Sequence, residues 1–139
     1  LIPGIDGEKM SKSRQNTINI FLPDKKLRKQ IMKIETDSIP MEEPKDPESC
    51  NVFALYKLLG TDEQINDLAS QYRGGNFGYG HAKQELYELI ISKYKVQRER
   101  FNYFMENRGE LDDILGAGAK KAREVAHKTL YRVRRELGY

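Results

Sequence analysis

Residues 46–72 read DPESCNVFALYKLLGTDEQINDLASQY and predict two consecutive helices separated at Gly60. Asp46-Pro47 fits an N-cap followed by a proline at the first helical position, where its missing N–H costs nothing. The segment 61–64, Thr-Asp-Glu-Gln, fits a capping box that starts the second helix. Apolar side chains recur at helical spacing on both sides of Gly60, at Val52, Leu55, Leu58, Leu59, Ile65, Leu68 and Tyr72.

A third helix precedes this pair. Pro23-Asp24 is a helix start, and the helix is expected to run to about Ile34. Residues 35–47 form a polar connector, because three prolines within it disfavour a helix interior. Before the helix, residues 18–22 are a short apolar stretch that fits either a strand or a packed connector.

Two further helices are expected after the glycine-rich turn of residues 74–80, from His81 to about Asn107 and from Glu110 to Leu137, the second irregular at residues 116–118. The last helix has an apolar stripe expected to face inward, at Ala119, Ala122, Ala126, Leu130, Val133 and Leu137. Its opposite face is basic, which fits either an RNA-backbone surface or a solvated helix back. The predicted fold class is all-α, a helical bundle.

Composition narrows the class of protein. The 139 residues are 38% hydrophobic and 32% charged, with a mean hydropathy of −0.74 and a net charge of +3. No apolar run approaches the roughly 18 residues that a membrane span requires. The single Cys50 excludes an internal disulfide and argues against a metal cluster, and it is expected to be a small buried residue. We therefore expect a cytoplasmic protein with no membrane partner and no metal site.

Residues 9–13 read Lys-Met-Ser-Lys-Ser. Two lysines three positions apart can place two cations on one polyphosphate, and serine hydroxyls can add hydrogen bonds. A cation beside a departing pyrophosphate stabilises the charge that develops as the bond to the α-phosphate breaks. The alternative is an ordinary solvated basic loop.

The pentapeptide, preceded by Pro3-Gly4-Ile5-Asp6-Gly7, resembles the second signature of the class I aminoacyl-tRNA synthetases. In that family the loop follows the last strand of an α/β nucleotide-binding domain. The resemblance implies that residues 1–22 end a catalytic domain and that residues 23–139 form a helical anticodon-binding domain. The first signature of the family, of the His-x-Gly-His type, does not occur in these residues. We therefore expect the chain to be the rear part of an enzyme, with the rest of the nucleotide-binding domain upstream of Leu1.

Four later segments of this chain resemble, in this order, segments of the carboxyl-terminal part of the tryptophanyl-tRNA synthetases. These segments are residues 35–38, 51–56, 79–83 and 116–122. The tyrosyl enzymes are the close alternative. This resemblance implies a whole enzyme that activates tryptophan with ATP and Mg²⁺, charges tRNA(Trp) and works as a homodimer. The piece alone is expected to be inactive and monomeric.

The resemblance also implies roles for individual residues. Lys9 and Lys12 would be catalytic, binding the ATP phosphates, and the ATP site would be completed by Met10, Ser11 and Ser13. Asp37 and Lys83 would lie near the anticodon, where a carboxylate can accept a hydrogen bond from the cytosine amino group. Their alternatives are an Asx-type turn and a lysine exposed to water in the first turn of a helix.

A hypothesis from another class remains open. The chain could be a self-sufficient helical module that binds RNA or protein, with the pentapeptide incidental.

Overall fold

The computed structural model describes residues 2–139, so Leu1 of the predicted segment 1–22 lies outside the described residues. Its helices are α1 (Asp24–Ile31), α2 (Asn51–Lys57), α3 (Asp62–Gly74), α4 (Tyr79–Lys93), α5 (Lys95–Glu106) and α6 (Arg108–Leu137), with a short 3-10 helix η1 (Pro47–Ser49). Residues 2–139 contain no strand, only an isolated antiparallel bridge between Pro3 and Lys9. The all-α prediction is confirmed, and the segment 18–22 is a connector.

The predicted helix starts are present. The Thr61 hydroxyl accepts a hydrogen bond from the Gln64 N–H at 3.3 Å, and the Gln64 side chain accepts one from the Thr61 N–H at 2.9 Å. This reciprocal pair is the capping box. Asp46 accepts a hydrogen bond from the Glu48 N–H at 3.0 Å, so it is an N-cap, although of η1.

Four predicted features of the helices were wrong. The first helix, expected to run to about Ile34, ends at Ile31. The single helix after Asp46 is divided into η1 and α2, because Cys50 has an extended backbone (φ −100°, ψ 123°). The helix predicted from His81 to Asn107 is divided between α4 and α5 at Tyr94 (φ −104°, ψ 18°). Conversely, α6 runs through Gly116 and Gly118 without a break. A glycine inside a helix costs only about 1 kcal/mol, and the alanines and lysines that follow favour the helix.

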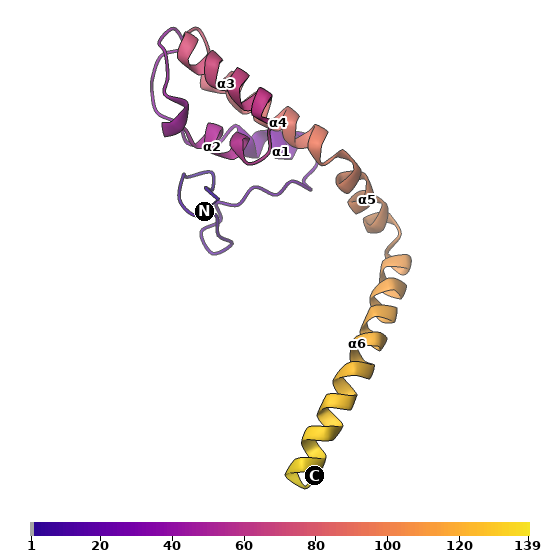
Figure 1. Cartoon of the computed structure of the whole chain (residues 1–139). Helices are drawn as coiled ribbons and strands as arrows, with labels where there is room; N and C mark the ends of the chain where they lie inside the picture. Colours follow the sequence, from indigo (N-terminus) through magenta and orange to yellow (C-terminus); the bar gives the residue numbers. More distant parts are fainter. Residues whose placement is uncertain (1) are drawn as a thin grey trace. The chain divides into compact units, whose positions relative to one another are not determined.

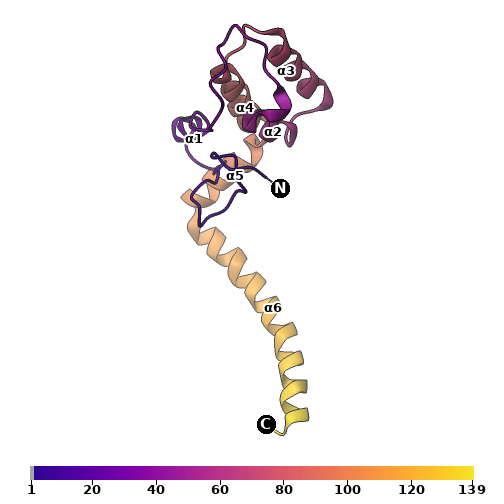
Figure 2. The same cartoon turned by 90° about the vertical axis from the view of Figure 1, so that its left-hand side faces the viewer.

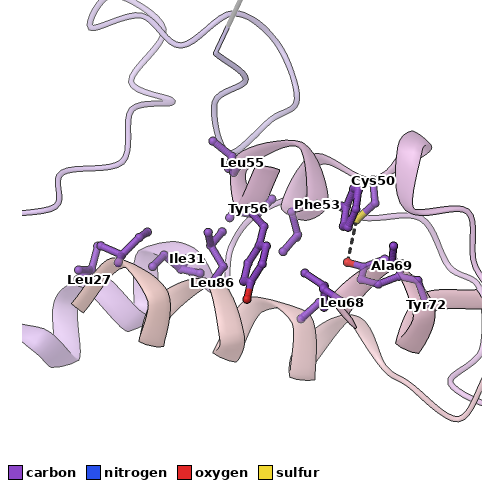
Figure 3. Packing of buried hydrophobic residues seen from close by; sticks show 14 residues of the cluster. Leu27, Ile31, Cys50, Phe53, Leu55, Tyr56, Leu68, Ala69, Tyr72 and Leu86 are labelled. Carbon is purple, nitrogen blue, oxygen red and sulfur yellow. Dashed lines mark hydrogen bonds between the residues drawn. The ribbon is translucent and has the colours of Figure 1, made fainter. Parts of the chain in front are cut away.

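The chain divides into two units, Leu1–Arg98 and Glu99–Tyr139. In the first unit, α1, α2, α3 and α4 pack around one core, with α2 and α1 each against α4 (Figures 1 and 2). Figure 3 shows Tyr72 of α3, which is 0% exposed, within this core. The Tyr72 ring lies 5.8 Å from that of Phe53 and 5.5 Å from that of Phe77, and its hydroxyl lies 3.3 Å from the Cys50 sulfur. The buried position predicted for Cys50 is confirmed.

One arginine fixes the connector before α1 to the start of α5. The guanidinium of Arg98 donates to the carbonyls of Ile20 and Leu22 and forms an ion pair with Asp24 at 2.6 Å. Most of the Arg98 side chain is shielded from water. This donor set satisfies backbone carbonyls in a segment that has no regular structure of its own.

The second unit consists of the end of α5 and α6, and α6 has no buried residue. We predicted that the apolar stripe of this helix faces inward. That prediction is wrong, since Leu130 and Val133 are exposed. An apolar stripe becomes buried only when another element lies along it, and this unit supplies no third element. Within residues 2–139, none of the helices combines the length and apolarity needed to cross a membrane.

Candidate functional site

The lysine-containing loop, residues 2–16, folds back on itself through backbone hydrogen bonds. The Gly4 N–H donates to the Glu8 carbonyl at 2.7 Å, and the Met10 N–H donates to the Ile2 carbonyl at 2.8 Å. A turn follows, in which the Gln15 N–H donates to the Lys12 carbonyl at 3.2 Å. The pentapeptide therefore begins on the bridged part of the loop and ends in a turn.

The side chain of Asn16 lies inside this fold and is only 2% exposed. Its amide nitrogen donates to the Asp6 carboxylate at 2.7 Å and to the Lys9 carbonyl at 3.1 Å. Its amide oxygen accepts from the Ser11 N–H at 2.8 Å. The hydrogen bond from Asn16, helped by one from the Glu8 N–H, keeps the pKa of Asp6 below its usual range.

The side chains proposed to meet phosphate are open to water. Lys9, Lys12 and Ser13 are exposed, and neither lysine forms an ion pair with another of residues 2–139. The hydroxyls of Ser11 and Ser13 are hydrogen-bonded to each other at 2.8 Å. Two unpaired ammonium groups and two hydroxyls are thus carried on a loop with a fixed backbone, which suits an anionic ligand.

Met10, unlike these lysines and serines, lies among apolar side chains. It is half-buried and lines a groove of about 430 Å³, whose other walls are apolar residues of the loop, of the connector after it, and of α2 and α4 and the residues that follow these helices. The groove is formed with Ile2, Ile18, Ile20, Leu55, Leu58, Leu59, Leu86, Ile90 and Tyr94. Met10 therefore shares an apolar groove with residues of the helical unit, whereas Lys9 and Ser11 do not line it.

The loop is joined to the helices at a second place. The Glu35 N–H donates to the Ile5 carbonyl at 2.7 Å, and the Asn51 side chain donates to the Glu35 carbonyl at 3.2 Å. Gly7 has a φ of +76°, and a Cβ there would lie 2.6 Å from the Asn51 amide nitrogen. A left-handed backbone and this close approach both require glycine.

Asp37 lines a small polar pocket of about 180 Å³, formed by Glu35, Thr36, Asp37, Ser49, Cys50, Asn51 and Tyr79. Its carboxylate also accepts a hydrogen bond from the Ile39 N–H at 3.1 Å, so the Asx-type turn is present. Burial, and then a hydrogen bond to Asp37, raise the pKa of Tyr79. Asp37 thus has a turn-forming role and, in addition, an exposed carboxylate at a pocket.

Lys83 is not one of the residues that line this pocket. It lies in the second turn of α4, four residues after Tyr79 and on the same helix face. The Lys83 side chain is half-buried, and its ammonium donates to the carbonyl of Met32 at 3.4 Å. Burial lowers its pKa. The structure thus places Lys83 against the end of α1 rather than free in water.

Sequence patterns missed two buried polar residues, Asn16 and Lys45. Lys45 is 3% exposed, and its ammonium donates to the carbonyls of Pro40, Met41 and Glu43 at 2.7, 3.2 and 2.8 Å. It also lies 5.5 Å from the centre of the Tyr79 ring. Both residues lie in polar stretches without helical periodicity, so no pattern marked them as buried. Among residues 2–139, no group of three His, Cys, Asp or Glu side chains could hold a metal ion.

The sequence matches a known family. The sequence model of the family described as "tRNA synthetases class I (W and Y)" matches residues 1–95. Over 138 residues, the chain is 42% identical to the tryptophan–tRNA ligase of Fusobacterium nucleatum and 43% identical to that of Campylobacter jejuni, and these matches cover 99% of the chain. The chain spans only 42% and 43% of the length of these relatives.

Solved structures agree with these matches. The crystal structure of tryptophanyl-tRNA synthetase from Campylobacter jejuni, complexed with ADP and tryptophan, superposes with a TM-score of 0.94 at 42% sequence identity. The match covers 100% of this chain and 44% of that one. A second crystal structure from the same organism gives the same TM-score and covers 45% of its chain.

Proposed function

The chain belongs to the class I tRNA synthetases of tryptophan and tyrosine, and from this premise we propose that it is the carboxyl-terminal part of a tryptophan–tRNA ligase. Residues 1–22 would end the catalytic domain, and residues 23–139 would form the helical domain that binds the anticodon. The relatives above are tryptophan ligases, which favours tryptophan over tyrosine. Nearly the whole of this chain matches one part of these longer ligases. A self-sufficient binding module is therefore not favoured.

The whole protein would join tryptophan and ATP and then charge tRNA(Trp), as a cytoplasmic homodimer. In the first step a tryptophan carboxylate oxygen bonds to the α-phosphorus of ATP, and the bond from that phosphorus to the pyrophosphate oxygen breaks. Residues 2–139 contain no group of three His, Cys, Asp or Glu side chains that could hold a metal ion, and we expect Mg²⁺ to arrive bound to the ATP phosphates. Without the rest of the catalytic domain, this piece should neither form the adenylate nor dimerise.

The observation that carries the proposal is the pair of unpaired lysines on a loop with a fixed backbone. Lys9 and Lys12 are exposed, while the Asn16 side chain fixes the backbone by donating to the Lys9 carbonyl and accepting from the Ser11 N–H. Their ammonium groups would bind the β- and γ-phosphates and stabilise the charge that develops on departing pyrophosphate. Ser11 and Ser13 would add hydroxyl hydrogen bonds, and Met10 would anchor the loop in its apolar groove.

The test uses the full-length protein and separates chemistry from substrate binding. Lys12→Ala should lower tryptophan-dependent ATP–pyrophosphate exchange by about 10²-fold, because it removes a group that stabilises transition-state charge. Tryptophan affinity, measured by calorimetry, should stay unchanged. Lys95→Ala is the matched control, since Lys95 is an exposed lysine on α5 without an ion pair to residues 2–139. Equal losses of exchange and tryptophan binding in Lys12→Ala would contradict the phosphate role.

The RNA-binding part is tested with this chain alone. Its binding to tRNA(Trp) should be compared with binding to a tRNA altered only in the anticodon, across a salt series. Discrimination that survives moderate salt would support anticodon reading by the helices. Binding that ignores the anticodon and decays steeply with salt would reduce their role to backbone attraction.

A further inference from the structure

We propose that Asn16 is a positioning residue for the phosphate-binding lysines: its buried side chain fixes the backbone on both sides of Met10 and thereby places Lys9 and Lys12. The inference rests on the proposed function, because it assigns Asn16 to the same loop. It goes further by naming a residue outside the pentapeptide that adenylate formation requires.

The hydrogen bonds of the Asn16 amide determine which way round it lies. Its nitrogen faces two acceptors, the Asp6 carboxylate and the Lys9 carbonyl, and its oxygen faces a donor, the Ser11 N–H. A reversed amide would bring oxygen against oxygen at two places. The side chain thus uses both of its N–H donors and is set in one orientation.

The backbone of the loop is built around this side chain. The Asn16 carbonyl accepts a hydrogen bond from the Ile5 N–H at 2.9 Å. A Cβ on Gly4 would lie 2.4 Å from the Asn16 amide nitrogen and 2.7 Å from its backbone oxygen. Glycine at position 4 therefore leaves the space into which the Asn16 amide fits.

This support matters because a lysine ammonium is a point charge on a flexible stem of four carbons. The charge can be aimed only if the backbone that carries it is fixed. Asn16 binds the carbonyl of Lys9 directly, and its bond to the Ser11 N–H fixes the residue before Lys12. A shift of about 1 Å in a catalytic group can cost about 10²-fold in rate, so loss of these bonds should be visible in the chemical step.

The experiment replaces Asn16 by its isostere in the full-length protein. Asn16→Asp keeps the shape but puts an oxygen opposite Asp6 and the Lys9 carbonyl, so both donated bonds are lost. We expect kcat for ATP–pyrophosphate exchange to fall by about 10²-fold. Tryptophan affinity should match that of the parent. The temperature of thermal unfolding should fall, because the change buries a carboxylate beside Asp6, so exchange is compared well below the unfolding temperature of the variant. Asn66→Asp, the same change at an exposed position of α3, is the matched control and should leave exchange intact.

A double-mutant cycle separates positioning from general structural support. If Asn16 acts through the lysines, Asn16→Asp should reduce exchange much less in a Lys12→Ala protein than in the parent. Asp6→Ala removes the acceptor beside Asn16 without touching the helical core, and it should lower kcat in the same direction even if Asn16→Asp folds poorly.

Unchanged exchange in Asn16→Asp, or fully additive losses in the cycle, would overturn the inference while Lys12→Ala alone still supports the proposed function. If Lys12→Ala also leaves exchange intact, the proposed function fails with it.

Discussion

Asn51 and Gly7 are in contact across 44 residues of sequence: the Asn51 amide nitrogen lies 2.6 Å from where a Cβ on Gly7 would be. Asn51 is the first residue of α2, it donates to the Glu35 carbonyl, and it lines the pocket that includes Asp37. The lysine-containing loop and the polar pocket lined by Asp37 therefore adjoin at the Asn51 side chain.

Gly7→Ala should loosen the loop from the helices. Alanine meets both a left-handed backbone and the Asn51 side chain, at a cost of about 1–3 kcal/mol. Hydrogen exchange of the Glu35 N–H, which donates to Ile5, should speed up, as read by NMR on this chain.

Gly74→Ala provides the comparison for Gly7. Gly74 is the last residue of α3, and a Cβ there would meet nothing within 4 Å. This change should leave the Glu35 exchange rate unaltered and should stabilise the helix by up to about 1 kcal/mol. Similar exchange rates in the parent and in Gly7→Ala would contradict the predicted role of the contact.

Asp37→Asn should separate the charge of this residue from its turn. Asparagine keeps an oxygen that can accept from the Ile39 N–H, so the turn remains, but the carboxylate is lost. If the carboxylate reads a cytosine amino group, both Asp37→Asn and Asp37→Ala in the full-length protein should weaken charging of tRNA(Trp) by about 10-fold. ATP–pyrophosphate exchange should be unaffected. Loss in Asp37→Ala alone would assign the effect to the turn.

Tyr72 should make the first unit sensitive to alkaline pH. Burial, and then the hydrogen bond with Cys50, raise the pKa of Tyr72 above the ordinary value of about 10. Above pH 10 the unfolded state therefore releases a proton that the native state keeps, so the free energy of unfolding falls as pH rises. The contribution of this residue to the slope is about 1.4 kcal/mol per pH unit, and it is absent below pH 10.

Urea unfolding of the parent and of Tyr72→Phe at pH 8 to 11 tests whether the free energy of unfolding falls above pH 10 because of Tyr72. The Tyr72→Phe protein should lose less stability above pH 10, and at pH 8 it should differ from the parent by no more than about 1.5 kcal/mol. Tyr131→Phe, at an exposed position of α6, should follow the parent. Parallel curves for Tyr72→Phe and the parent would refute the prediction.

Arg98→Ala should destabilise the first unit by about 2–3 kcal/mol. It leaves the carbonyls of Ile20 and Leu22 without their donor, and unsatisfied shielded groups are costly. Arg98→Lys should recover only part of the loss, since one ammonium replaces a fork of donors. Urea unfolding measures the free energy of unfolding of both Arg98 variants. Arg123→Ala, on the exposed surface of α6, is the control, and its free energy of unfolding should stay within about 0.5 kcal/mol of the parent's. A loss no larger than that of the control would show that the connector does not need Arg98.

Local sequence determined which stretches are helical and the capped start of α3, although not where two of the predicted helices divide. The capping box of Thr61 and Gln64 involves two residues three positions apart, and the apolar spacing of Val52 and Leu55 repeats within one turn. Such features depend only on near neighbours, so they could be predicted before any tertiary contact was known. The pentapeptide was identified in the same way, from residue types at fixed spacing.

Tertiary structure decided which predicted faces are buried and what supports the loop. The apolar stripe of α6 has the right period but stays exposed, because burial requires a second surface that periodicity alone does not supply. Asn16 reads as an ordinary polar residue until the chain brings Asp6, ten residues away, within 2.7 Å of it. The contact of Gly7 with Asn51 arises in the same way. Sequence thus determined the helices and the reactive residue types, whereas only close approach of distant segments determined where the reactive residues are fixed.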